Sequence, residues 1–101
     1  MEIRVKKEGR SAEIFLKGEF DHHGAKGLTL QLEREIEVLL PLRLILDFTD
    51  VMFMDSSGIA VVLRTDRRMK ELGGSISLRG LGQQPRKLLE AAGINRMVEM
   101  E

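Results

Sequence analysis

The 101-residue chain contains no cysteine, which excludes disulfide bonds, thiolate nucleophiles and zinc sites with sulfur ligands. It has no excess of either charge, because 16 basic residues balance 16 acidic ones, and nothing indicates an electrostatic contact with nucleic acid. No apolar run approaches the roughly 20 residues that span a membrane. The N-terminus lacks the apolar stretch and small-residue cleavage site of a signal peptide. These absences predict a cytoplasmic domain that contacts neither nucleic acid nor membrane.

Apolar residues make up 43% of the sequence and charged residues 32%, which is typical of one globular domain with a modest core. Apolar and polar residues alternate over 3–5 and 12–16, which predicts two strands. The glycine-containing turn at 8–11 joins these strands as a hairpin. Further along, the pattern predicts helices over 25–40, 59–72 and 85–92 and strands over 42–48, 75–78 and 97–100.

A strand pair followed by three helix–strand units predicts an α/β fold in which residues 1–101 form a single domain. We expect a mixed central sheet with an N-terminal hairpin and with helices mainly on one face. In such sheets, functional sites lie at the carboxyl ends of the strands. The sequence Asp55-Ser56-Ser57-Gly58 follows one strand end, and Asp21-His22-His23 follows another, so we expect the two segments to be neighbours.

The four residues from Asp55 to Gly58 are predicted to lie at the N-terminus of a helix, where unpaired N–H groups carry partial positive charge. Such a place suits a nucleophile, a bound anion or a phosphate on the serine itself. The simplest interpretation is structural, with Ser56 or Ser57 as the N-cap and Asp55 favouring the helix dipole. Gly58 weakens a helix, but it leaves the backbone bare for a partner to approach.

Catalysis by Ser56 would need a base, which His22 or His23 could provide with Asp21 or Asp55 as the orienting acid. The hydrolase motif Gly-x-Ser-x-Gly is incomplete here, because its first glycine is missing. A metal site from the same aspartates and histidines is disfavoured, since adjacent histidines point apart in an extended chain. No Gly-Lys-Ser/Thr sequence predicts a nucleotide-binding loop. We therefore expect no enzyme activity, cofactor or metal.

Two further features concern packing. Met52, Phe53 and Met54 cannot all face the core, and we predict that two of them do. The alternative interpretation places an exposed member beside Ile59 in a contact patch, for which methionine is well suited. Asp66 falls on the apolar stripe of its helix, where it either reaches past the sheet edge into solvent or pairs with a buried cation. We prefer the solvent interpretation, because an unpaired buried carboxylate is costly.

Three blocks of sequence together resemble a known family. These are GEFDHH at 18–23, FMDSSG at 53–58 and LGG at 72–74. They resemble the STAS domain of bacterial anti-sigma factor antagonists, and within it the stage II sporulation branch. The resemblance runs from Ile3 to about Val98. Sporulation members extend further than Glu101, which leaves open whether a final helix belongs to this chain.

The resemblance implies a partner-switching protein. Members of the family bind an anti-sigma factor that is also a serine kinase, and so release the sigma factor. The kinase uses ATP to phosphorylate the first serine of the Asp-Ser-Ser-Gly block, here Ser56, and a serine phosphatase reverses the reaction. The expected partner-binding surface comprises Asp21, His22, His23, Asp55, Ser57, Gly58 and Ile59. The alternatives are an unphosphorylated STAS scaffold, a small-ligand sensor or a serine hydrolase, and the pathway could serve sporulation or the stress response.

Overall fold

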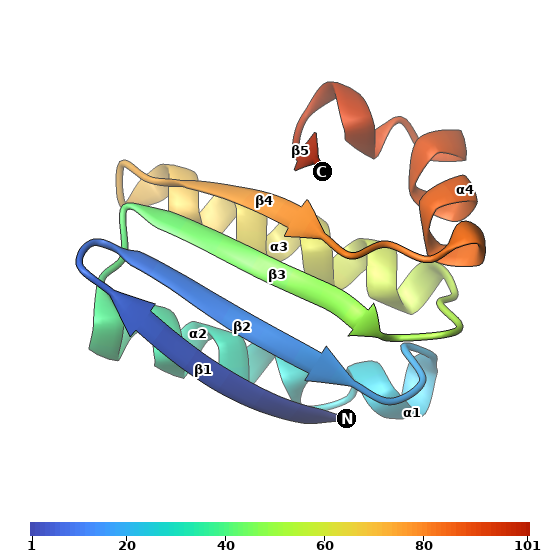
Figure 1. The fold of residues 1–101 in the computed structure, drawn as a ribbon, viewed down its shortest axis with the longest axis horizontal. Helices are drawn as coiled ribbons and strands as arrows, with labels where there is room; N and C mark the ends of the chain where they lie inside the picture. The colour runs from blue at the N-terminus through green and yellow to red at the C-terminus, as the bar shows by residue number, and fades with distance from the viewer.

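A computed structural model describes every residue from Met1 to Glu101. Five strands form one sheet in the order β1-β2-β3-β4-β5, with an antiparallel β1–β2 hairpin and parallel pairing elsewhere (Figure 1). The strands are β1 (Glu2–Glu8), β2 (Ser11–Lys17), β3 (Arg43–Asp50), β4 (Ser75–Arg79) and β5 (Glu99–Met100). The helices are α1 (His22–Ala25), α2 (Leu28–Leu39), α3 (Ser56–Glu71) and α4 (Gln83–Ala91), with a 3₁₀ turn η1 (Ile94–Arg96). The predicted α/β architecture with an N-terminal hairpin is confirmed.

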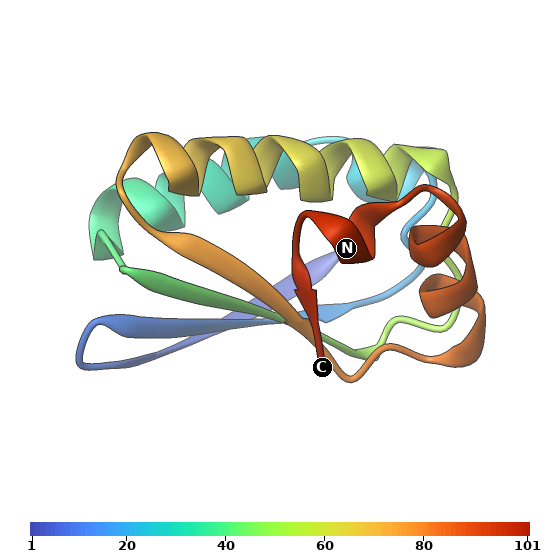
Figure 2. The same cartoon turned by 90° about the horizontal axis from the view of Figure 1, so that it is seen from above.

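Helices α1, α2 and α3 cover one face of the sheet, and the other face carries no helix (Figure 2). The core lies between the sheet and this helical layer. Inward-facing positions alternate along the strands, so Ile14, Leu44 and Leu78 are all fully buried. Leu32 of α2 and Val62 of α3 close the core from the other side. None of the helices is both long and apolar enough to span a membrane.

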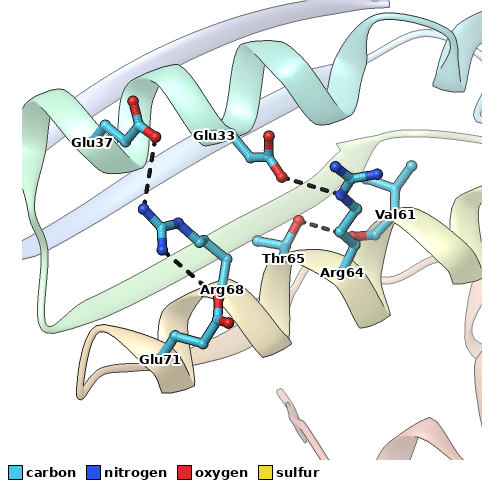
Figure 3. Close-up of polar contacts among 7 residues, drawn as sticks. All are labelled: Glu33, Glu37, Val61, Arg64, Thr65, Arg68 and Glu71. Carbon is cyan, nitrogen blue, oxygen red and sulfur yellow. Dashed lines mark hydrogen bonds and ion pairs between the residues drawn. The ribbon is translucent and has the colours of Figure 1, made fainter.

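Ion pairs join the outer faces of α2 and α3, which run side by side (Figure 3). Arg64 Nε lies 3.1 Å from Glu33 Oε1. One turn later, an Arg68 guanidinium nitrogen lies 3.6 Å from Glu37 Oε1. In each pair one side chain is more than half exposed to solvent, so each pair contributes at most about 1 kcal/mol. The main attachment of the two helices is therefore their buried apolar face, and the ion pairs favour the observed pairing of their outer faces.

Helix boundaries differ from the predicted ones for local reasons. The helix predicted over 25–40 starts later, at Leu28, because its N-cap Gly27 adopts a left-handed conformation with φ of 81°, and the four-residue helix α1 precedes it. Helix α3 begins at Ser56 rather than at residue 59. Helix α4 begins at Gln83, two residues before Pro85. The first turn of a helix accepts proline, because backbone N–H groups in that turn have no carbonyl partner within the helix.

The preferred interpretation of Asp66 was wrong. Its side chain is only 6% exposed, and its Oδ2 lies 2.9 Å from Nζ of Lys70. The lysine side chain is 57% exposed, so its partner is a surface cation rather than a buried one. Because residues four apart share a helix face, Lys70 can reach back along α3 to the carboxylate. This contact offsets the cost of placing a carboxylate on the buried side of the helix.

Candidate functional site

The two polar segments singled out in the sequence lie together at one end of the sheet. Phe20 and Met54 form an isolated parallel bridge beyond the ends of β2 and β3. The Phe20 N–H donates to the Phe53 carbonyl at 2.9 Å, and the Asp55 N–H donates to the Phe20 carbonyl at 3.1 Å. Helix α1 packs against α3 directly after this bridge. The expected proximity of the Asp21 and Asp55 segments is therefore confirmed.

Each segment enters its helix through an aspartate. Asp21 Oδ1 accepts a hydrogen bond from the Gly24 N–H at 2.8 Å and caps α1. Asp55 Oδ1 accepts from the Ser57 N–H at 2.8 Å and caps α3. Asp55 has an extended backbone, which lets its carboxylate turn back onto the first helical turn. The interpretation of Ser56 or Ser57 as the N-cap was wrong, since both serines lie inside the helix.

Ser56 is consequently the first residue of α3, and it is exposed, whereas Ser57 is half-buried. The carboxylate of Asp55 already takes the N–H of Ser57 and leaves the Ser56 hydroxyl clear of the cap. A phosphate on Ser56 would sit at the positive end of a 16-residue helix. The geometry therefore allows modification of Ser56 without unfolding the helix start.

Packing inside the protein explains why a glycine stands at position 58. A Cβ atom at this position would lie 2.7 Å from Met54 Cε, 2.8 Å from Met54 Cγ and 3.1 Å from Phe20 Cγ. The glycine thus lets the first turn of α3 approach the bridged pair closely. Gly58 itself is buried in the chain, so the structure explains it without a partner. Direct contact of Gly58 with a partner stays a prediction.

Exposed apolar side chains flank the serine. Met52 is 78% exposed and Phe53 is 44% exposed, while Met54 is fully buried. The prediction that two of these three residues face the core was wrong, because the chain leaves the sheet after β3 and only Met54 turns inward. Ile59 is half-buried and packs against the core. The site therefore has two exposed apolar groups rather than one.

The histidines of α1 are both exposed, with ring centroids 6.1 Å apart in an edge-to-face arrangement. Nowhere in the structure do three or more His, Asp or Glu side chains lie close enough to hold a metal ion. Neither histidine makes a hydrogen bond to Ser56, so the structure contains no serine–histidine pair of the kind a hydrolase uses.

One residue of the site was missed in the sequence. Gln84, the second residue of α4, accepts a hydrogen bond from the Met54 N–H at 2.8 Å through Oε1. Its Nε2 donates back to the Met54 carbonyl at 2.8 Å. Thirty residues separate the two partners, and a polar glutamine near a helix start carries no signal of a distant contact.

A buried carboxylate lies near the carboxyl end of β3 on the helix-free face of the sheet. Asp47 is 8% exposed, and its Oδ1 accepts from the Thr49 N–H at 2.9 Å. Burial raises the pKa of Asp47, but hydrogen bonds from Thr49, a contact with Glu13 and the charge of Arg79 together bring it below its ordinary value. Asp47 therefore stays ionised and holds the Thr49 N–H near the carboxyl end of β3.

The fold and the site geometry agree with a comparison against known families. The sequence profile described as the STAS domain matches residues 2–101. This chain belongs to the STAS domain family. The match covers nearly the whole chain, so the sheet, the helical layer and the Asp55–Gly58 segment all belong to this one domain.

Relatives of this STAS domain are named as anti-sigma factor antagonists. An anti-sigma-B factor antagonist of Bacillus subtilis (strain 168) is 29% identical over 98 residues, covering 97% of this chain and 88% of the relative. An anti-sigma F factor antagonist of Paenibacillus polymyxa is 26% identical over 85 residues, covering 84% and 73%. The structure of the anti-sigma factor antagonist SpoIIAA in its unphosphorylated form matches with a TM-score of 0.83 at 25% identity, covering 99% of this chain and 88% of that one.

Proposed function

We propose that this STAS domain is an anti-sigma factor antagonist. Its unphosphorylated form binds an anti-sigma factor that is also a serine kinase, and this binding releases the sigma factor. Phosphorylation of Ser56 ends the interaction, and a serine phosphatase restores it. The names of the relatives support the general function. SpoIIAA, to which this chain is similar, has structures in unphosphorylated and phosphorylated forms.

The observation that carries the proposal is the position of Ser56. It is exposed at the first residue of α3, three residues after the exposed Phe53 and four after the exposed Met52. A kinase can reach this hydroxyl without opening the fold. The same surface would be covered when the unphosphorylated domain binds its partner, because exposed apolar groups favour burial in an interface.

The proposed switch is electrostatic and steric. A phosphate adds roughly −1.5 to −2 charges at Ser56, where the helix dipole favours it. The carboxylates of Asp55 and Asp21 cap neighbouring helices and partly cancel this gain by repulsion. The domain therefore keeps its backbone. Inside a packed interface the phosphate would be buried without a partner, at a cost of several kcal/mol, which lowers affinity by about a thousandfold.

The remaining members of the proposed partner surface follow from the same geometry. His22, His23 and Asp21 lie on or next to α1, which packs beside α3. Asp55 and Ser57 flank Ser56 in the chain, and Ile59 lies one turn further along α3. In this proposal Asp21 and the exposed histidines contact the partner directly, and the carboxylates of Asp21 and Asp55 also hold the starts of α1 and α3 in place.

The test is to incubate the purified chain with its cognate anti-sigma kinase and ATP. We expect a mass increase of about 80 Da, and phosphopeptide mapping should place it on Ser56. Ser56→Ala should bind the kinase but resist the switch, and Ser56→Asp should lose binding. Ser75→Asp is the matched control, because Ser75 is an exposed serine at the opposite, amino end of the parallel strands. A phosphate on Ser57, or equal loss of binding in both aspartate variants, would contradict the proposal.

Amide NMR spectra separate a local switch from an allosteric one. Phosphorylation should shift only resonances near residues 21–23 and 55–60, since the sheet does not rearrange. Shifts spread across the sheet would refute the steric-electrostatic mechanism. If the kinase neither binds nor modifies the chain, the domain acts instead as an unphosphorylated scaffold or a ligand sensor.

A further inference from the structure

The backbone at Met54 is hydrogen-bonded on two sides. On one side its partner is the backbone of Phe20, and on the other it is the side chain of Gln84. Strand β3 ends at Asp50, and Met54 rejoins the sheet as a single parallel bridge to Phe20. That bridge uses the Phe53 carbonyl and the Asp55 N–H. Successive residues of an extended chain point their peptide groups in opposite directions. The N–H and C=O of Met54 itself therefore face away from Phe20.

On this second side the sheet offers no strand. β4 ends at Arg79, and the chain turns through Gly80 and Gly82 into α4 (Figure 1). The Met54 side chain is fully buried, so its backbone groups would lie at the edge of the core without a strand to pair with. Buried backbone groups without partners are costly and rare in folded proteins. The side chain of Gln84 supplies the hydrogen-bond partners that a neighbouring strand would otherwise provide.

We propose that Gln84 is a positioning residue of the Ser56 site: its side-chain amide replaces the missing strand and fixes the 52–55 segment for recognition by the partner. A primary amide carries one acceptor and donors on adjacent atoms, as a peptide group does. Oε1 accepts a hydrogen bond from the Met54 N–H, and Nε2 donates one to the Met54 carbonyl, both at 2.8 Å. Glutamate lacks the donor and alanine lacks both groups.

The residues proposed to be recognised by the partner lie directly before and after Met54. Met52 and Phe53, which are exposed, come directly before it, and the Asp55 cap and Ser56 come directly after it. Gln84 thus ties α4 to the position of the serine. A partner binds only the fraction of molecules in which this segment has the competent conformation, so apparent affinity falls by that fraction. This inference rests on the proposed function, because the recognition step is that of the anti-sigma kinase.

The experiment compares Gln84→Ala and Gln84→Glu with Gln83→Ala. Gln83 is the preceding residue of α4, is also exposed and makes no hydrogen bond to Met54, so it is a matched control. We expect hydrogen exchange of the Met54 amide to accelerate at least tenfold in Gln84→Ala. In the same variant, kinase affinity and kcat/KM for Ser56 phosphorylation should fall about tenfold, mainly through KM. Gln84→Glu should keep the contact to the N–H and lose function to an intermediate extent, because its carboxylate repels the Met54 carbonyl.

The outcomes separate this inference from the proposed function. Equal kinase affinity and equal Met54 exchange in the alanine variants of Gln83 and Gln84 would overturn the role of Gln84. Faster Met54 exchange with unchanged kinase affinity would overturn its part in recognition and leave only a structural contact. If the wild-type chain is not bound or phosphorylated at all, the proposed function fails and the recognition role of Gln84 fails with it. In that case Met54 exchange still decides whether the amide holds the segment.

Discussion

Replacing Gly58 by alanine tests whether close packing under the serines is as tight as the structure indicates. The new Cβ would lie 2.7 Å from Met54 Cε, 2.8 Å from Met54 Cγ and 3.1 Å from Phe20 Cγ. The Met54 methyl can rotate away. The Met54 Cγ and the Phe20 ring have little room, because both side chains are almost completely buried.

Two opposing effects set the magnitude. Overpacking a well-filled core costs about 1–3 kcal/mol. Alanine favours a helix over glycine by up to about 1 kcal/mol. Because Gly58 is the third residue of α3, where helix preference counts less than in the middle, the packing cost should dominate. We expect Gly58→Ala to lower the free energy of unfolding by about 1–2 kcal/mol. It should also displace the helix start that carries Ser56.

Urea denaturation measures this loss. Gly82→Ala is the matched control, since Gly82 has φ of −71° and its nearest neighbour to a new Cβ is Pro85 Cδ at 3.9 Å. Gly82 is the N-cap of α4, where alanine is somewhat less favoured than glycine, so the control should lower stability by only about 0.5 kcal/mol. In the double variant with Met54→Ala, the loss should be smaller than the sum of the two single losses by at least about 0.5 kcal/mol. A neutral Gly58→Ala variant, or strictly additive losses, would show that the space beside Gly58 is not filled.

Substitutions at three further residues test other contacts. Asp21→Asn should change the free energy of unfolding by no more than about 0.5 kcal/mol, because asparagine caps helices as well as aspartate does. Asp21→Ala should lower it by about 1 kcal/mol, as measured by thermal melts. Equal losses in the two variants would show that Asp21 does not stabilise α1 as its N-cap. Lys70→Ala should lower the free energy of unfolding by about 1–2 kcal/mol because it leaves the buried Asp66 without its cation, and an unchanged denaturation midpoint would show that water replaces Lys70. The folded-state pKa of Asp47 lies below its ordinary 3.8, so its contribution is fully present above that pH and is lost as the pH falls through the lower folded value. Asp47→Asn should therefore weaken the protein at neutral pH and flatten its acid denaturation profile, and a parallel profile would contradict the low pKa.

Much of the fold could be read from local patterns. Alternating residues predicted the β1–β2 hairpin, and the apolar strand after Pro41 predicted β3. These patterns work because an element's burial is set by the spacing of its own residues. The position of both aspartate segments at one sheet end also followed from the sequence, since parallel strands bring their carboxyl ends together.

The details that define the site depended on contacts between distant segments. Nothing local distinguishes a serine cap from an aspartate cap in Asp55-Ser56-Ser57, and the choice followed from the backbone that the bridge to Phe20 imposes. A glycine is needed at position 58 because the side chains of Met54 and Phe20 leave no room for a Cβ atom. Phe20 follows β2 and is far from Gly58 in the sequence.

Two polar side chains show the same division. Asp66 lies on the buried side of α3, and the apolar stripe alone did not reveal that Lys70 pairs with its carboxylate. Gln84 pairs with a peptide group 30 residues away. The sequence determined which segments form strands and helices, because that depends on periodicity within each segment. Only the tertiary structure decided which backbone groups lack a strand neighbour, and therefore which side chain has to supply one.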